Sequence, residues 1–186
     1  MITVITGGSG SGKSAYAEQM VLDAGDLNRI YIATMFPFDE ESHRRIARHR
    51  AMRAEKKFTT LECYTGLKHL RIPEHSCVLL ECMSNLTANE MFQENGAGIH
   101  TVEAVLEGVQ NLAKQAEQLI IVTNEIFSDG IEYDAETKTY QKYLGEINQQ
   151  LAKWASQVTE VVYGIPVHWK KKDKEGQKNE TIMEQL

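Results

Sequence analysis

The sequence predicts an α/β fold built on a mainly parallel sheet. Short runs rich in β-branched residues recur along the chain, and stretches with helical periodicity separate them. This alternation is typical of strand–helix–strand units, in which successive strands lie parallel. Strands are expected at residues 2–6, 29–34, 59–63, 77–82, 119–123 and 160–163.

A phosphate-binding motif directly behind the first expected strand supports the same fold class. Residues 7–14 read Gly-Gly-Ser-Gly-Ser-Gly-Lys-Ser and fill every position of G-x-x-x-x-G-K-[ST]. The glycines allow backbone N–H groups to point at phosphates, the lysine adds positive charge, and the serine hydroxyl binds Mg²⁺. Helix formers follow at residues 13–22, so the phosphates would meet a helix N-terminus. The residues expected to bind a nucleoside triphosphate are Gly7, Gly8, Ser9, Gly10, Ser11, Gly12, Lys13 and Ser14.

Two further stretches carry apolar residues at helical spacing, and each is expected to pack one face on the sheet. The first stretch contains Val102, Val105, Leu106, Val109, Leu112, Ala113 and Ala116. The second contains Tyr140, Tyr143, Leu144, Ile147, Leu151, Trp154 and Val158. We interpret both stripes as core rather than as ligand contacts.

Length and composition favour one soluble domain. The 186 residues suit a single domain at residues 1–169 and a polar, mobile tail at residues 170–186. The net charge of −6 disfavours nonspecific nucleic-acid binding and favours small-molecule substrates. The three cysteines form no C-x-x-C pair, so neither a disulfide framework nor a zinc site is expected. The chain shows no signal-peptide pattern and no apolar run near the ~20 residues that span a membrane, so we expect a cytoplasmic protein.

A basic helix, expected at residues 39–57 with Asp39 as its cap, narrows the chemistry. Arg45, His49 and Arg53 are spaced by four and share one helix face. Nearby positive charge disfavours the imidazolium, which keeps His49 neutral and nucleophilic, while the arginines can hold phosphates. Spacing alone leaves a second interpretation open, a solvated basic face with an incidental histidine.

Carboxylates are expected near the metal and at the ligand-binding edge of the sheet. Glu81 ends an expected strand, where a phosphate-loop fold places the acid that holds Mg²⁺ or its waters. The expected metal site therefore consists of Ser14 and Glu81, with a strand-end surface acid as the alternative for Glu81. Asn124 and Glu125 follow another apolar strand and should emerge at the same carboxyl edge.

The chain resembles the bifunctional adenosylcobinamide kinase/adenosylcobinamide-phosphate guanylyltransferases of cobalamin assembly, over nearly its whole length to about residue 164. The segments that carry the resemblance are residues 6–14 with Ala17-Glu18, Tyr31-Ile32-Ala33-Thr34, Arg45-Ile46 with His49-Arg50 and Arg53, Thr60 with Glu62, Leu79-Leu80-Glu81-Cys82, Val122-Thr123-Asn124-Glu125, and Gly145 with Asn148-Gln149. This resemblance implies a P-loop NTPase-type, RecA-like domain whose mostly parallel sheet is flanked by helices.

The resemblance also implies a reaction. In such proteins the histidine that His49 matches attacks the α-phosphate of GTP, expels pyrophosphate and carries GMP to adenosylcobinamide phosphate, which yields adenosylcobinamide-GDP. A kinase step that phosphorylates adenosylcobinamide with GTP or ATP uses the same Mg²⁺-dependent site. Lys13 and His49 are then catalytic, and the subunits form a homotrimer with sites near subunit boundaries.

The resemblance assigns further nucleotide contacts to Ala33, Thr34, Arg50, Arg53, Glu62 and Glu81. A carboxylate such as that of Glu62 can accept the N1 and N2 hydrogens of guanine, which adenine does not offer. An exposed salt bridge is an equal alternative for Glu62.

Two other functions remain compatible with the motifs. One is a small-molecule kinase in which His49 is never modified. The other is a guanine-nucleotide switch, although Thr123-Asn124-Glu125-Ile126 does not supply the N-K-x-D motif that such proteins use. Departures from the family pattern at Glu132, Gln141 and Lys142 bear on the corrinoid contacts and the kinase step.

Overall fold

The computed structural model describes residues 1–38, 40–127 and 130–171. Within α2 (Glu40–Ala54), the description leaves out five side chains, those of Ser42, Arg45, Arg48, His49 and Met52. One seven-stranded sheet has the order β3-β2-β4-β5-β1-β6-β7. Its strands are β1 (Ile2–Thr6), β2 (Asn28–Ala33), β3 (Thr59–Glu62), β4 (Ser76–Glu81), β5 (Gln118–Val122), β6 (Gln157–Val162) and β7 (Ile165–Lys171).

Neighbouring strands from β3 to β6 pair in parallel, and only β7 pairs antiparallel with its neighbour, β6. The predicted mainly parallel sheet is therefore confirmed. Parallel pairing brings the carboxyl ends of β1 to β5 to one edge, where α/β folds bind ligands. The strand order places β5 between β1, which precedes the phosphate loop, and β4, which ends in Glu81.

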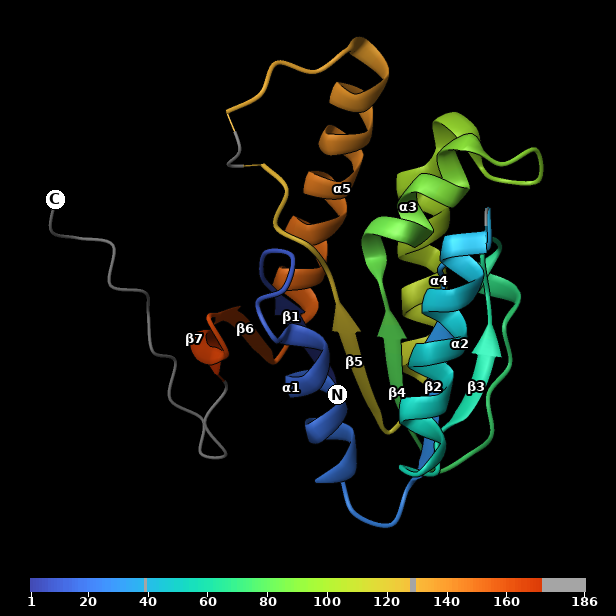
Figure 1. Ribbon diagram of the computed structural model, residues 1–186, viewed down its shortest axis with the longest axis vertical. Helices are drawn as coiled ribbons and strands as arrows, with labels where there is room; N and C mark the ends of the chain where they lie inside the picture. The colour runs from blue at the N-terminus through green and yellow to red at the C-terminus, as the bar shows by residue number, and fades with distance from the viewer. Residues whose placement is uncertain (39, 128–129, 172–186) are drawn as a thin grey trace, which may run out of the picture.

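Helices cover both faces of this sheet. They are α1 (Lys13–Leu22), α2, α3 (Met83–Phe92), α4 (Thr101–Gln115) and α5 (Ala135–Trp154), with short 3₁₀ turns η1 (Leu67–His69) and η2 (Gly98–His100). In Figure 1, α1 and α2 lie in front of the sheet. On that face α1 packs Ala17 and Val21 against Ile5 and Leu79. Helices α3, α4 and α5 pack in the larger core of the other face, so the chain forms the predicted single α/β domain of P-loop type.

The two predicted apolar stripes are core. In α4, Val105, Val109 and Leu112 are fully buried, and Leu144 and Leu151 are fully buried in α5. Apolar residues at this spacing stay on one side of a helix, which presses that side onto the sheet. Trp154 and Tyr140 are partly buried and pack against the same core, as expected.

Several boundaries differ from the predictions for local reasons. The basic helix ends at Ala54 rather than at residue 57, and Lys57 has a positive φ of 58°, outside helical geometry. The capping role predicted for Asp39 lies outside the described residues. Val158 was predicted on the second helical stripe, and this was wrong: the helix ends at Trp154 and Val158 lies in β6, beside Val4 of β1.

The C-terminal strand was not anticipated. Polar and basic residues interrupt the apolar pattern of β7, so the sequence showed no clear strand signal there. Pairing with β6 nevertheless extends the strand to Lys171. Pairing therefore continues past the expected boundary at residue 169, and residues 172–186 of the expected tail lie outside the described residues. Helix α3 likewise lacked a clear apolar stripe in the sequence. None of the helices in the described part of the chain is both long and apolar enough to cross a membrane.

Candidate active site

The phosphate loop connects β1 to α1 and requires glycine at two strained positions. Gly7 has φ +150°, and a Cβ atom there would lie 2.5 Å from the carbonyl oxygen of Val161. Gly12 caps α1 with φ 92°, a left-handed conformation that glycine adopts without steric cost. The loop is closed by hydrogen bonds from the N–H of Ser11 to the carbonyl of Gly8 at 3.3 Å and from the N–H of Gly164 to the carbonyl of Ser11 at 2.8 Å.

Lys13 and Ser14 begin α1 and face the carboxyl end of β4. Lys13 Nζ donates to the carbonyl oxygen of Gly8 at 3.0 Å, so its ammonium group lies over the loop. The Ser14 hydroxyl donates to Oε1 of Glu81. The structure therefore brings together the two residues predicted to hold the metal, although they are separated by 67 positions in the chain.

Tyr31 and Arg53 extend this cluster toward α2. The Tyr31 hydroxyl donates to Oε2 of Glu81 at 3.3 Å, and the Arg53 guanidinium carbon lies 3.5 Å from the centre of the Tyr31 ring. Burial and then the Glu81 carboxylate raise the pKa of Tyr31 above its ordinary value, so the hydroxyl remains a donor. Arg53 is 4% exposed, and its Nε and Nη1 atoms have no hydrogen-bond partner among the described residues. A buried guanidinium with unpaired donors is typical of an anion-binding site.

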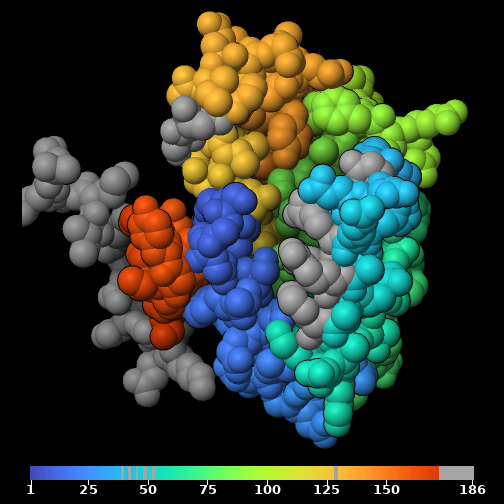
Figure 2. Space-filling view, viewed as in Figure 1, coloured from blue at the N-terminus to red at the C-terminus, as the bar shows by residue number. Residues whose placement is uncertain are grey.

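Three contacts hold the C-terminal end of α2 and the residues after it against β2 and α1. Arg53 stacks on Tyr31, Arg29 Nη1 donates to the carbonyl of Lys56 at 3.1 Å, and the Lys56 ammonium pairs with Glu18. Stacking of a guanidinium on an aromatic ring contributes about 0.5–2 kcal/mol, more when the pair is desolvated. These contacts place the basic helix beside the phosphate loop, as Figure 2 shows for α2 (cyan) and the loop (blue) on one face of the molecule.

A cavity of about 410 Å³ lies between the loop, the strand ends and α2, and we call it the loop cavity. Its lining residues are Ser9, Gly10, Lys13, Ser14, Tyr31, Ala33, Met35, Ile46, Arg53, Glu81, Cys82, Asn85, Val122, Asn124, Glu125 and Ile126. The volume suits part of a nucleotide rather than a whole large cosubstrate. Asn124 and Glu125 thus emerge at the expected edge of the sheet.

Thr34 does not line the loop cavity. It is fully buried, its hydroxyl donates to the Cys82 carbonyl at 2.9 Å and accepts from the Cys82 N–H at 2.7 Å, and its own N–H donates to the Glu81 carbonyl at 3.1 Å. These bonds tie the end of β2 to the end of β4. Burial raises the pKa of the Cys82 thiol, so it stays protonated and is a poor metal ligand.

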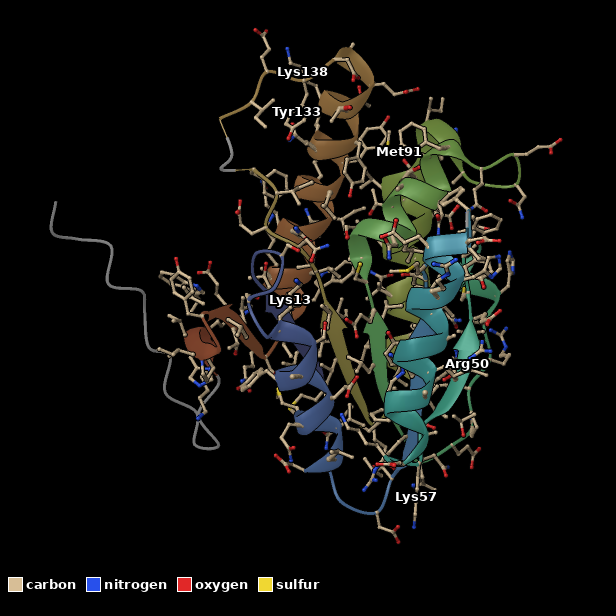
Figure 3. All side chains as sticks on the ribbon, viewed as in Figure 1. Lys13, Arg50, Lys57, Met91, Tyr133 and Lys138 are labelled. Carbon is tan, nitrogen blue, oxygen red and sulfur yellow. The ribbon has the colours of Figure 1, made fainter. Side chains whose placement is uncertain are left out.

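Glu62 and Arg50 lie together, apart from the loop cavity. The Arg50 guanidinium pairs with Oε1 of Glu62, and the Tyr64 hydroxyl donates to Oε2 at 2.9 Å. Glu62 lines a second cavity of about 640 Å³, which we call the outer cavity. Figure 3 shows Lys13 at the start of α1 and Arg50 on α2, the two helices in front of the sheet.

The side chains of Arg45 and His49 lie outside the described residues. Their backbone belongs to α2, in which Ile46 and Arg53 line the loop cavity. Position 49 follows Ile46 by three residues and precedes Arg53 by four. Residues at these spacings share one helix face.

Sequence reasoning missed several cavity residues, among them Tyr31, Met35 and Asn85. Tyr31 and Ala33 alternate along β2, so strand periodicity could have placed both on the face that bears the loop. Met35 and Asn85 carry no such signal, because a connecting segment and a new helix bring them to the cavity.

A phosphate loop, an acid on a nearby strand end and a buried arginine with donors that no described residue satisfies define a P-loop nucleotide-binding enzyme site. A family model described as cobinamide kinase / cobinamide phosphate guanyltransferase matches residues 3–169. The chain belongs to this family, which confirms the resemblance drawn from its motifs.

Curated relatives agree with this assignment. The bifunctional adenosylcobalamin biosynthesis protein CobU of Escherichia coli (strain K12) is 31% identical over 181 residues, which cover 90% of this chain and 98% of that protein. The bifunctional adenosylcobalamin biosynthesis protein CobP of Pseudomonas aeruginosa is 31% identical over 170 residues, covering 90% and 96%. Among solved structures, a KaiC-like protein from Pyrococcus horikoshii OT3 has a TM-score of 0.49 at 12% identity, covering 86% of this chain and 71% of that chain.

Proposed function

We propose that this enzyme transfers GMP from GTP to adenosylcobinamide phosphate and also phosphorylates adenosylcobinamide. One observation carries the proposal: Lys13, Ser14 and Arg53 line the same cavity, and the buried Arg53 keeps Nε and Nη1 without a hydrogen-bond partner among the described residues. A P-loop kinase places its cations around the β- and γ-phosphates, between which the bond breaks. A second cationic group on α2 supports chemistry at another phosphate of the same nucleotide.

Mg²⁺ is the cofactor that the donor set fits. The Ser14 hydroxyl and the Glu81 carboxylate are hard oxygen ligands in contact with one another, and Mg²⁺ sites of this kind combine one or two such groups with waters and phosphates. Ser14 and Glu81 would hold the ion, with Tyr31 orienting Glu81. The ion would neutralise charge that develops on the phosphates.

His49 is proposed as the nucleophile of GMP transfer. The lone pair of an imidazole nitrogen forms a P–N bond to the α-phosphorus. The bond between the α-phosphorus and the oxygen that bridges to the β-phosphate breaks, and pyrophosphate leaves with the electrons of that bond. A phosphate oxygen of adenosylcobinamide phosphate then attacks the same phosphorus, and the P–N electrons return to His49. Splitting one displacement into two lowers the barrier of each. Lys13 and Arg53 are proposed to bind the phosphates, and Arg50 is proposed as a further nucleotide contact beside Glu62.

One labelling experiment tests this function. The protein is incubated with Mg²⁺ and GTP labelled at either the α or the γ position, then denatured. We expect acid-labile, base-stable α-label on the protein, together with γ-label on added adenosylcobinamide. Intact GTP binding without any α-label would contradict the transferase; γ-label on the acceptor would then indicate a single-activity kinase, and hydrolysis without an acceptor a switch.

Replacing Glu81 with glutamine should impair use of the metal. The Glu81→Gln variant keeps the shape but loses the charge, so we expect the Mg²⁺ concentration for half-maximal GTP binding to rise about tenfold and turnover to fall on the order of 10²-fold. A Mg²⁺ titration of binding and of turnover measures both. Glu117→Gln, which alters an acid paired with His75 at 2.5 Å, serves as the control, and an unchanged midpoint in Glu81→Gln would count against the metal site.

Self-association, as a homotrimer, is also proposed, and the β6–β7 hairpin supports it. Tyr163, Ile165 and Trp169 are 94%, 65% and 68% exposed on the last strand pair of the sheet. Exposed apolar side chains along an edge strand form a typical association surface. The free thiols of Cys63, Cys77 and Cys82 support a reducing, cytoplasmic location.

Charge on this hairpin should weaken association. We expect Ile165→Glu to lower the oligomer mass measured by size-exclusion chromatography with light scattering, because burial of a carboxylate without a partner is unfavourable. Ile99→Glu is the matched control, since Ile99 is 82% exposed on η2. An unchanged mass for Ile165→Glu, or dissociation of Ile99→Glu instead, would place the interface elsewhere.

A further inference from the structure

Three cavities that share lining residues mark a path from the phosphate loop to Glu62. A small cavity of about 270 Å³ shares Met35 and Asn85 with the loop cavity. The same small cavity shares Phe36 and Gln93 with the outer cavity. The residues that line the three cavities therefore extend in succession from the loop to the outer cavity.

The register of the sheet sets the length of this path. Ala33 of β2 pairs with Glu81 on one side and with Glu62 on the other. Adjacent strands are about 4.8 Å apart, so the two acids lie about 10 Å apart along the sheet edge. That separation matches a nucleotide whose phosphates lie at the loop and whose base lies at Glu62.

Gln93 carries an unexplained buried donor on this path. Its side-chain Nε2 atom is buried and has no hydrogen-bond partner among the described residues. Its backbone is held by an N–H bond to the Asn89 carbonyl at 3.0 Å and by the Gly96 N–H at 2.9 Å. A buried amide donor without a partner is costly, so this donor is available to an acceptor that enters the cavity.

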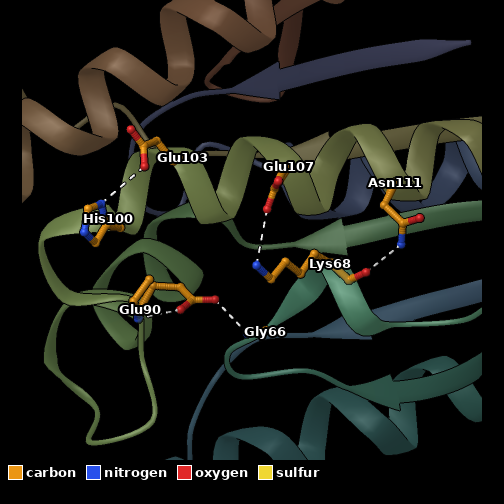
Figure 4. Close-up of polar contacts among 8 residues, drawn as sticks. Gly66, Lys68, Glu90, His100, Glu103, Glu107 and Asn111 are labelled. Carbon is orange, nitrogen blue, oxygen red and sulfur yellow. Dashed lines mark hydrogen bonds and ion pairs between the residues drawn. The ribbon is translucent and has the colours of Figure 1, made fainter.

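The walls around Gln93 are fixed by a buried acid. Glu90, 3% exposed, accepts the N–H of Gly66 at 2.7 Å and the N–H of Ala97 at 3.0 Å. Figure 4 shows Glu90 joined to the Gly66 loop. These bonds tie α3 to two loops beside the outer cavity, so the position of Gln93 relative to Glu62 is preorganised.

The outer cavity carries groups complementary to a 6-oxopurine. Arg50 and Tyr64 each bond one oxygen of Glu62, yet an ionised carboxylate has about four lone-pair sites and can still accept two hydrogens. Burial and the hydrogen bond to Glu62 raise the pKa of Tyr64 to about 12, so it remains a donor. Phe36 and Tyr64 meet edge to face at 5.2 Å and offer aromatic surface to a planar base.

We propose that Gln93 determines nucleotide specificity by donating to the 6-oxygen of a guanine base held at Glu62, the contact that the family resemblance implies. Glu62 accepts the N1 and N2 hydrogens, and Gln93 supplies the donor that completes recognition of the same base edge. Adenine presents an amino donor to the Gln93 donor and has no N1 hydrogen for Glu62 to accept. Both contacts therefore disfavour adenine. This inference rests on the proposed guanylyl transfer and extends it to the selection of the nucleotide.

Nucleotide analogues test the role of Gln93. Binding of GTP, ITP and 2-aminopurine riboside triphosphate with Mg²⁺ is measured by calorimetry on the full chain and on Gln93→Met, which keeps volume but loses the amide. We expect GTP and ITP, which both carry the 6-oxygen, to bind about fivefold to tenfold more weakly to the variant. The 2-aminopurine analogue, which lacks that oxygen, should bind equally to both proteins.

The matched control is Gln141→Met, which removes an amide from another cavity that adjoins the loop cavity. Equal weakening of all three analogues by Gln93→Met would indicate a packing role and overturn the proposal, as would no change at all. A GTP-specific loss in Gln141→Met would place the base in that other cavity. The binding measurement requires no covalent step. Absence of α-label on the wild-type protein would therefore contradict the proposed function, while the analogue affinities would still test the role of Gln93.

Discussion

The His49→Ala variant is expected to form no α-labelled protein and to lose guanylyl transfer on the order of 10³-fold or more, as follows from removal of a catalytic nucleophile. GTP binding should persist, because the loop cavity retains Lys13, Ser14 and Arg53. Transfer of γ-phosphate to adenosylcobinamide should also persist, since that step needs no histidine. Acid-labile label retained after denaturation and a separate γ-transfer assay measure the two activities.

His43→Ala is the matched control for this experiment. His43 lies on the same helix and is exposed, but its spacing from position 49 does not place it on the same face. It should form label at the wild-type rate. Full α-labelling of His49→Ala would move the nucleophile to another residue, and loss of GTP binding in this variant would show that His49 supports the site structurally.

The Lys13→Ala variant is expected to lose both half-reactions by about 10²- to 10³-fold, the usual cost of removing a fixed donor from developing phosphate charge. The ammonium group of Lys13 lies over the loop through its 3.0 Å bond to the Gly8 carbonyl. Both the α-phosphate and the γ-phosphate reactions depend on how this loop holds the triphosphate. The rates of α-label and γ-label transfer and the affinity for GTP, measured in parallel, should therefore all fall together.

Two variants make the Lys13 result interpretable. Lys13→Arg keeps the charge but replaces a compact ammonium by a planar guanidinium, so we expect only partial recovery. Lys114→Ala removes an exposed lysine in the last turn of α4 and should behave as wild type. If Lys13→Ala impaired only γ-transfer, the two reactions would not share one phosphate site.

Local sequence signals predicted the secondary structure where periodicity was strong. The helix at Lys13–Leu22 begins and ends as predicted, and the predicted strands at residues 29–34 and 77–82 each lie within one residue of β2 and β4. Prediction failed where tertiary contacts decide the element. Val158 fits a helical stripe, yet pairing with β1 makes it a strand residue. Strand β7 exists through its pairing with β6, since its own residues are mostly exposed.

The site was only partly predictable for a related reason. The loop, Glu81 and Arg53 carry spacing or strand-end signals, and the structure brings them to one cavity. Two other predicted nucleotide contacts do not line this cavity: the Thr34 hydroxyl is bonded to the backbone of Cys82, and Glu62 lines the outer cavity. The roles of His49 and of the remaining contacts stay predictions for the experiments above.

By itself the sequence determined that this chain has a phosphate loop on a mainly parallel α/β sheet, because glycine spacing and strand–helix alternation are local properties. It also determined the family, through motifs distributed along most of its length. Only the tertiary structure decided that Arg53 is buried over Tyr31, that Ser14 meets Glu81, and that Gln93 faces the cavity of Glu62. Those contacts join residues from different elements, and their geometry depends on strand order and register, which local sequence patterns do not encode.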